Sequence, residues 1–417
     1  MTEFLKLVSP AEALALLMHS LPERIPENEL VDTIHAAGRV TAEDVRASQS
    51  LPSFSRSSMD GFAVRARDIF GVSESLPGYL TIRGEVPMGA EPVFSIESGQ
   101  AAIIHTGGML PQNADAVVML ECTERTRKDE IAILRAVAPG ENAILMGEDV
   151  QEGQIVIRCG TQIRPAETGG CMALGITQLR VAKKPKIGIL SSGDEVIPPD
   201  QIPGPGQVRD VNSYSLAALV AEAGGEPVLF GIVEDKLEFL KNRAAKGLSE
   251  CQLMIITAGS SASARDMTAE AIDSLGAPGV LVHGVNVRPG KPTILAVCDG
   301  KAVIGLPGNP ISALVIAGLF VVPVVRRLLG EKVARPDKSC LARLTINVPS
   351  QAGREDWIAV KLIPSTAQSK GLDNWLAEPI FAKSNLIFSL TRADGLVQIP
   401  ADVTGLESGE QVQVFLF

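Results

Sequence analysis

The chain has 417 residues, of which 46% are hydrophobic and 21% charged, and its formal net charge is −10. This composition is typical of a globular protein, and the length predicts roughly two to four domains. Nucleic acids and anionic membranes bind basic surfaces, so the acidic charge excludes both as expected partners, and an anionic substrate would need a local cluster of positive charge.

The cysteines and histidines are scattered along the chain, and no two cysteines form a C-x-x-C pair. No signal peptide is recognised, so we expect reduced thiols in a cytoplasmic protein and no zinc site. The longest apolar run, residues 311–325, is too short to span a bilayer and contains Pro323. We therefore expect it to form a helix in the core or at a dimer interface.

The first predicted element is a helix in SPAEALALLMHSL. Ser9 and Glu12 have the spacing of a capping box, and Pro10 occupies the first helical position. Short strands and Gly/Pro turns then predict a compact β-rich insert at 51–145. Strand-like residues return after it, and we expect them to pair with the segment that precedes the insert.

From residue 186 onward, apolar strands alternate with helices. This pattern predicts a parallel sheet covered by helices on both faces. TILAVCDGKAVIGL adds a hairpin with an Asp-Gly turn, and a long apolar helix follows it. After Gly330, short strands with turns predict a small β-barrel or sandwich.

Three polar loops follow strands of this α/β region, at 191–195, 257–266 and 305–312. Ligands of open α/β sheets bind at the carboxyl ends of the strands, so we expect the loops to converge on one pocket. A further turn, RPGKP, places Arg288 and Lys291 near the same edge. In so acidic a chain, these cations favour a clamp for phosphate or an oxyanion over two solvated side chains.

The loop GLPGNPIS has the clearest chemistry of these loops. Asn309 and Pro310 suit the start of a helix, and Gly308 permits close approach of a ligand. The helix would point free N–H groups at the pocket, with Ser312 in its first turn, and so form an oxyanion site. The alternative is a Pro-Gly turn that only begins a helix.

Carboxylates at the same edge need an explanation, because Asp194 and Glu195 end the turn of KIGILSSGDEV where a phosphate usually binds. Acids beside an anion site are costly unless a divalent cation bridges them. Mg²⁺ binds a few carboxylates together with substrate oxygens, so the acids predict a Mg²⁺ site. For Asp235 and Asp266 the alternative role is helix capping.

Together, SSMDGFAV, HTGGMLP, ADAVVMLE, GEDV, SSGDEV, RDVNSYSL, RPGKP and GLPGNPISA resemble the molybdopterin molybdenumtransferase family, which includes the bacterial MoeA-type enzymes and the C-terminal domain of gephyrin. The motifs occur in family order over nearly the whole chain. The resemblance implies a multidomain α/β plus β fold: a central three-layer α/β/α molybdopterin-binding domain, β-rich N-terminal domains and a C-terminal β-barrel. The expected parts are an N-terminal helix packing on the α/β domain (1–26), a discontinuous β segment (27–50 and 146–180), the β-rich insert (51–145), the α/β/α domain (181–330) and the barrel (331–417).

The resemblance also implies a reaction. The family inserts molybdenum from molybdate into adenylylated molybdopterin and releases AMP, with the assistance of Mg²⁺. We expect a homodimer, and a further expected partner is the upstream molybdopterin adenylyltransferase. Two alternatives remain open: a catalytically impaired dimeric scaffold or binding protein of the same family, and a molybdopterin adenylyltransferase.

Site residues are carried over from the family motifs position by position. The expected catalytic residues are Asp60, Thr106, Asp149, Glu195, Asp235 and Asp266, and the last three are also the expected metal ligands. The expected substrate-binding residues are Ser192, Gly193, Asp194, Gly259, Ser261, Arg288, Lys291, Pro292, Pro307, Gly308, Asn309, Pro310, Ser312 and Ser384. In the dimer, Asp60 and Thr106 would act across the interface.

The chain departs from the family pattern at four positions. Ala258 and Ser263 replace glycines, which alters the pocket if either position needs a positive φ. Arg288 replaces the usual lysine, which keeps the charge and changes its geometry. Ala359 stands where the family often has an arginine, so a cation that helps to hold molybdate is missing there.

Overall fold

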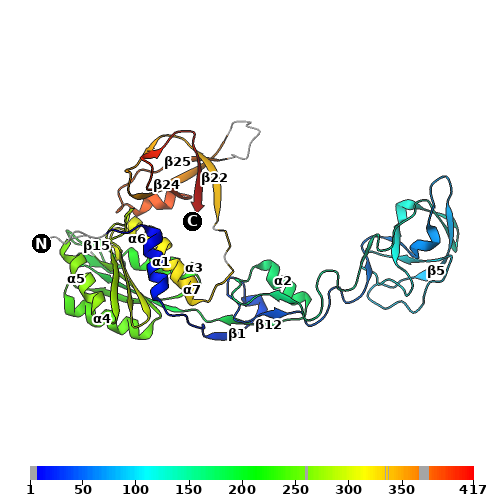
Figure 1. Ribbon diagram of the computed structural model, residues 1–417, viewed down its shortest axis with the longest axis horizontal. Helices are drawn as coiled ribbons and strands as arrows, with labels where there is room; N and C mark the ends of the chain where they lie inside the picture. Colours follow the sequence, from blue (N-terminus) through cyan, green and yellow to red (C-terminus); the bar gives the residue numbers. More distant parts are fainter. Residues whose placement is uncertain (1–6, 259–261, 334, 337, 366–374) are drawn as a thin grey trace.

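The computed structural model describes residues 7–258, 262–333, 335–336, 338–365 and 375–417. The molecule is elongated (Figure 1). The α/β unit and the C-terminal barrel lie at one end, the β-rich insert lies at the other, and a narrow region that carries α2 (Pro165–Ala173) connects them.

A mixed six-stranded sheet forms the centre of the α/β unit. Its strand order is β16 (Glu226–Val233), β13 (Lys186–Ser192), β17 (Leu253–Ala258), β21 (Lys301–Pro307), β20 (Ile294–Cys298) and β18 (Pro278–His283). The first four strands are parallel, whereas β20 runs antiparallel to both neighbours, so the sheet is not wholly parallel as predicted. The predicted hairpin is the reason: Asp299 and Gly300 both take positive φ and reverse the chain between β20 and β21.

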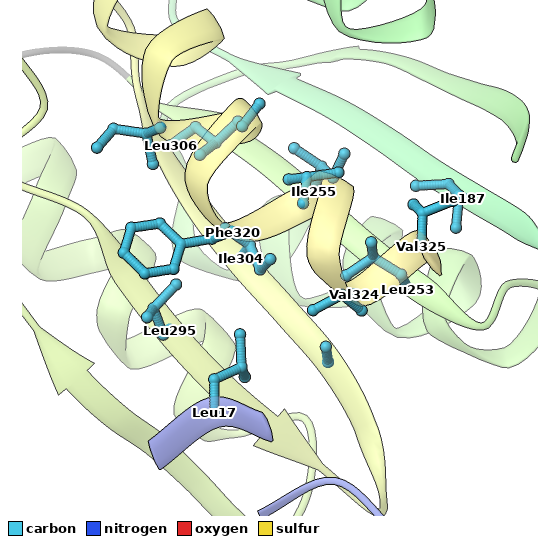
Figure 2. Close-up of a cluster of buried hydrophobic side chains, with 14 of the residues drawn as sticks. Leu17, Ile187, Leu253, Ile255, Leu295, Ile304, Leu306, Phe320, Val324 and Val325 are labelled. Atoms are coloured by element: carbon cyan, nitrogen blue, oxygen red, sulfur yellow. The ribbon is translucent and has the colours of Figure 1, made fainter. Parts of the chain in front are cut away.

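Helices pack on both faces of this sheet. One hydrophobic cluster joins the sheet to α1 (Pro10–Ser20), α3 (Asn212–Glu222), α6 (Pro310–Ile316) and α7 (Val322–Leu328). A second cluster joins it to α4 (Leu237–Glu250) and α5 (Ala262–Asp273). Figure 2 shows the first cluster, in which Phe320 and Val324 lie among side chains of the strands and Leu17 of α1. The predicted capping box of α1 is confirmed, with both Ser9–Glu12 hydrogen bonds present.

The long apolar helix runs from Pro310 to Leu328 and has the length and composition of a membrane span. Its side chains Phe320, Val321 and Val325 are fully buried in the core, so the prediction of a core helix is confirmed. The segment Ala317–Val321 is π-helical. Pro323 lies just beyond it and has no N–H to donate, which favours a local change of hydrogen-bond pattern.

The narrow connecting region is built from two distant pieces of chain. Strand β1 (Asn28–Asp32) pairs with β12 (Gln178–Ala182), and β2 (Val45–Arg46) pairs with β11 (Ile155–Ile157). The segment before the insert therefore pairs with the segment after it, as predicted. Next to the insert, β3 (Arg56–Ser57) pairs with β10 (Ala143–Ile144).

Two further short pairs lie outside this region. They are β14 (Val196–Ile197) with β15 (Val208–Arg209) in the α/β unit, and β23 (Val348–Pro349) with β27 (Gly405–Leu406) in the C-terminal part.

The insert has its own sheet and its own core. The strand order is β7 (Ala116–Met119), β4 (Gly61–Val64), β6 (Gln100–Ile104), β5 (Gly78–Glu85), β9 (Glu130–Ile133) and β8 (Thr123–Arg127). Alternate residues of β4 enter two separate hydrophobic clusters, Phe62 in one and Ala63 in the other. Both faces of the sheet are therefore buried at β4, whereas the edge strand β8 is largely exposed.

Of the two predicted C-terminal architectures, the structure has the barrel. Its strands are β22 (Ser339–Leu344), β24 (Glu355–Pro364), β25 (Trp375–Pro379), β26 (Gly395–Ile399) and β28 (Gln411–Leu416). The sheet closes because β24 pairs with both β25 and β26. Strand β19 (Val287–Arg288), from the α/β unit, pairs with β24 and joins the two parts.

Candidate functional site

A cavity of about 850 Å³ lies between the α/β unit and the barrel. Its walls are the turn after β19, the end of β21 with the start of α6, part of β24, and the segment 380–384. The structure therefore brings two of the predicted turns to one cavity. The expected substrate-binding residues that line it are Arg288, Lys291, Pro292, Pro307, Asn309, Ser312 and Ser384, and Gly308 and Pro310 are chain neighbours of these.

The cavity is cationic. Arg288, Lys291, Arg354 and Lys383 line it, and among the described residues no aspartate or glutamate does. The chain as a whole carries a net charge of −10, so the cations are concentrated here against the overall charge. Such a cavity attracts anions such as phosphates and oxyanions.

Two of these cations share one buried carboxylate. Nε and Nη2 of Arg354 donate to Asp356 at 2.7 and 3.1 Å, and Nη1 of Arg288 lies 3.8 Å from the same carboxylate. The Asp356 side chain is 1% exposed, whereas Arg288 is 64% exposed and open to a ligand. The contact joins an arginine of the α/β unit to an arginine of the barrel.

At the start of α6, one backbone N–H that the sequence predicted to be free already makes a hydrogen bond. The N–H of Ile311 donates to the carbonyl of Ser384 at 3.1 Å, so it is not free for a ligand. Asn309 occupies the N-cap position, but its side chain makes no capping hydrogen bond. Ser312 is buried at the cavity wall. The segment that carries Ser384 therefore closes part of the expected oxyanion site, a contact over more than seventy residues that no local pattern announces.

The acids at the ends of β13 and β16 form a separate group outside the cavity lining. Ser192 donates to the carboxylate of Asp235, and the N–H of Asp235 donates to Asp194 at 3.1 Å. Gly193 has φ 151°, and a Cβ there would lie 2.9 Å from the Glu195 carboxylate, so this turn requires glycine. Glu195 itself is exposed.

The structure does not gather the three predicted metal ligands. Across the described part of the chain, no three side chains of His, Cys, Asp or Glu are grouped as a metal site. Two carboxylates, those of Asp194 and Asp235, do lie at neighbouring strand ends. That donor set fits Mg²⁺, which uses one or two carboxylates and takes its other ligands from substrate phosphate and water.

The capping alternatives for Asp235 and Asp266 are wrong. Helix α4 begins at Leu237 with Lys236 at the N-cap position, and Asp266 lies inside α5, which begins four residues earlier. Alanines at 262 and 264 favour this earlier helix start. Gly259 and Ser261 lie outside the described residues, as does the side chain of Ser263, whose backbone is in α5.

Ala258 does not have the backbone strain that a positive φ would cause. It is the last residue of β17, is buried, and pairs with Pro307 in the neighbouring strand. Among the residues that the structure describes, the non-glycine residues with positive φ are Asn113, Asn142 and Asp299, so Ala258 is not one of them. An alanine at this position is therefore compatible with the strand, and it lines the cavity.

The remaining predicted catalytic residues lie far from the cavity, in and beside the insert at the other end of the molecule (Figure 1). Asp60, Glu85, His105 and Thr106 form what we call the Asp60 corner. The N–H and hydroxyl of Thr106 donate to Asp60 at 2.8 and 3.2 Å, and His105 lies between Asp60 and Glu85 at 3.7 and 3.0 Å. The hydrogen bond from the Thr106 backbone lowers the pKa of Asp60.

Asp149 is also exposed, and its N–H donates to the carbonyl of Leu51 at 3.1 Å. It therefore lies where the outgoing and returning segments of the insert meet. A single chain does not bring Asp60, Thr106 or Asp149 to the cavity.

Three residues of the site were not identified from sequence: Asp356, Trp357 and Lys383. Trp357 and Lys383 line the cavity, and Asp356 holds two of its arginines. For Lys383 the available signal was its position next to Ser384 in KSN. Asp356 stands among charged residues in GREDW, which by themselves indicate only an exposed strand end.

Comparisons with known proteins cover nearly the whole chain. Residues 8–175 match the MoeA N-terminal region (domain I and II), residues 188–327 a probable molybdopterin binding domain, and residues 341–417 the MoeA C-terminal region (domain IV). A putative molybdopterin biosynthesis protein of Methanocaldococcus jannaschii is 36% identical in an alignment of 414 positions that covers 96% of each chain. The molybdopterin molybdenumtransferase of Nostoc sp. is 33% identical over 93% of this chain and 88% of its own.

A solved structure shows the same architecture. The molybdopterin biosynthesis MoeA protein of Pyrococcus horikoshii superposes with a TM-score of 0.83 at 33% sequence identity, covering 99% of this chain and 100% of that one. The likeness therefore includes all parts of the molecule, the α/β unit, the insert and the barrel.

Proposed function

The chain belongs to the MoeA family of molybdenum cofactor biosynthesis, and we propose that it is a molybdopterin molybdenumtransferase that inserts molybdenum from molybdate into adenylylated molybdopterin and releases AMP. The observation that carries the proposal is the cationic cavity between the α/β unit and the barrel. It is large enough for a drug-sized ligand, and its cations match substrates that are oxyanions and phosphates.

Within this proposal the cavity residues bind and orient charge. Lys291 supplies a mobile point charge, and the planar guanidinium of Arg354 supplies directed N–H donors for an oxyanion. Ser312 and Ser384 add neutral polar groups to the wall. By holding molybdate next to the pterin dithiolene, these residues would replace an encounter of two dilute reactants by a step within one complex.

Mg²⁺ is part of the proposal. Asp194 and Asp235, with Glu195 close by in sequence, would hold it together with substrate phosphate oxygens. When bound, the ion would neutralise phosphate charge and so assist the departure of AMP. Asp266, on α5, would contribute only through an intervening water or substrate.

A homodimer completes the proposal. Asp60 and Thr106 are too far from the cavity of their own chain to act there (Figure 1). The insert of one protomer would therefore approach the α/β unit of its partner and bring the Asp60 corner to a shared site. The upstream molybdopterin adenylyltransferase would supply the adenylylated substrate.

The deciding experiment is anaerobic incubation of the purified protein with adenylylated molybdopterin, Mg²⁺ and molybdate, with AMP release as the readout. We expect AMP release that depends on molybdate. Tight ligand binding without AMP release would instead favour the scaffold, and transfer of AMP from ATP to molybdopterin would favour the adenylyltransferase. An omission of molybdate from otherwise identical mixtures is the matched control.

A further inference from the structure

Asp356 is a buried carboxylate behind the wall of the cationic cavity, and the function proposed above assigns it no part. It lies on β24 and its residue exposure is 0%. It does not line the cavity, but both of its charged neighbours, Arg288 and Arg354, do. A buried charge is costly unless it is paired, so this carboxylate depends on the two arginines.

The contact with Arg354 fixes an orientation. Nε and Nη2 donate to Oδ1 and Oδ2 of Asp356 at 2.7 and 3.1 Å, which is a two-point contact between planar groups. Such a contact sets the plane of the guanidinium as well as its position. It leaves Nη1 of Arg354 for a ligand.

The contact with Arg288 is fixed by the backbone. Arg288 and Asp356 are direct partners in the parallel pairing of β19 with β24, and Nη1 of Arg288 lies 3.8 Å from Oδ2. The carboxylate therefore lies between two cations from different parts of the chain. Without it, two guanidinium groups would face each other without a shared counter-charge, and their repulsion would move them apart.

We propose that Asp356 is a positioning residue that holds Arg354, with Arg288 beside it, in the arrangement that binds a tetrahedral oxyanion in the cavity. The identity of that oxyanion as molybdate rests on the proposed function. Asp356 acts through the arginines and does not touch the ligand. Its removal should therefore weaken oxyanion binding and leave the rate of the bound complex nearly unchanged.

A double-mutant cycle tests this inference. Wild type, Asp356→Asn, Arg354→Gln and the double variant are titrated with sodium molybdate and, separately, with inorganic phosphate by calorimetry. We expect Asp356→Asn to raise the Kd for molybdate about tenfold in the wild-type background and less than about twofold in the Arg354→Gln background. In the AMP-release assay, KM for molybdate should rise similarly while kcat stays within about twofold.

Asp394→Asn is the matched control, because Asp394 is a barrel carboxylate that accepts the N–H of Leu362 at 2.7 Å and does not line the cavity. It should leave the Kd for molybdate unchanged. Arg354→Lys tests the same idea without altering position 356: it keeps the charge, loses the two-point contact, and should weaken molybdate binding as Asp356→Asn does.

Equal effects of Asp356→Asn in both backgrounds would overturn the inference, as would wild-type affinity in Arg354→Lys. The outcome is separable from that of the proposed function. A wild-type protein that binds molybdate without molybdate-dependent AMP release would refute the proposed function, while the titrations would still decide the role of Asp356. A wild-type protein that binds neither anion would refute the inference.

Discussion

The cationic cavity and the Asp60 corner hold their polar side chains in different ways. In the cavity, Arg354 is anchored to a carboxylate that is fully buried, and segments from three distant parts of the chain meet. In the Asp60 corner every contact is exposed and lies within the insert. The comparison indicates that one chain organises the cationic cavity by itself, whereas in the proposed dimer the corner would act only against a surface of the partner protomer.

Removal of Lys291 from the cavity should have the largest effect on activity. Lys291→Gln is expected to lower kcat/KM for molybdate-dependent AMP release about 100-fold, because a cation aimed at developing or bound negative charge is lost from a partly closed site. Lys383→Gln, which removes another cation of the cavity lining, should lower kcat/KM less, about tenfold. Equal activity of Lys291→Gln and wild type would show that the cavity is not the site of the reaction.

Mixing two inactive variants tests whether the corner acts across a dimer. Asp60→Ala and Lys291→Gln protomers should each be nearly inactive alone. If the site takes Asp60 from one protomer and Lys291 from the other, random mixed dimers restore about a quarter of wild-type activity, since half the dimers are mixed and each has one intact site.

The measurement is AMP release after the two variants are unfolded and refolded together. Co-refolding of wild type with the doubly substituted chain sets the reference. Mixed dimers that stay inactive would place both residues in the same site of one chain, contrary to the proposal.

Adding the missing barrel cation should have a smaller effect. Ala359 lines the cavity, so Ala359→Arg places a further guanidinium beside the anion. We expect KM for molybdate to fall about threefold with little change in kcat. A rise in KM would show that a further cation in the cavity does not improve molybdate binding. Ala359→Gln controls for side-chain volume.

The titration of Asp60 should show the smallest change. Its pKa lies below the ordinary value, chiefly because the backbone N–H of Thr106 donates to the carboxylate. The carboxylate should therefore stay ionised as the pH falls past the ordinary pKa, and the contact should be lost only as the pH falls through the lowered value. Thr106→Val keeps the backbone donor, so carbon-detected NMR should still find a low midpoint.

Thr106→Pro removes that donor and is the counterpart of the valine variant. Its Asp60 midpoint should return toward the ordinary value. If the Asp60 midpoint already returns toward the ordinary value in the valine variant, the hydroxyl of Thr106 and not its N–H lowers the pKa of Asp60.

Local patterns predicted the local structure of this chain well. The capping box at Ser9, the reversal at Asp299 and the helix start at Pro310 are all present, because each depends on residues close in sequence. The start of α5 was misplaced because an aspartate before MTAEAI has the pattern of an N-cap, whereas the alanines at 262 and 264 favour an earlier helix start.

Contacts between distant segments could not be predicted in the same way. Nothing near Ser384 indicates that its carbonyl accepts the N–H of Ile311, and nothing near Asp356 indicates two arginine partners. These contacts follow from the seating of the barrel on the α/β unit through β19 and β24. That docking depends on how the folded domains fit together, and no repeating residue pattern in the sequence indicates it.

The insert is carried by two lengths of chain that leave and return together. They are hydrogen-bonded at successive points, by β2 with β11, by Leu51 with Val150, and by β3 with β10. A single tether would allow rotation about each of its backbone bonds, whereas two paired tethers resist torsion and bend mainly where pairing stops. The two paired tethers thus fix the distance between the insert and the α/β unit. A one-residue deletion in one tether alone should tilt the insert. Matched deletions in both tethers should bring the insert closer to the α/β unit.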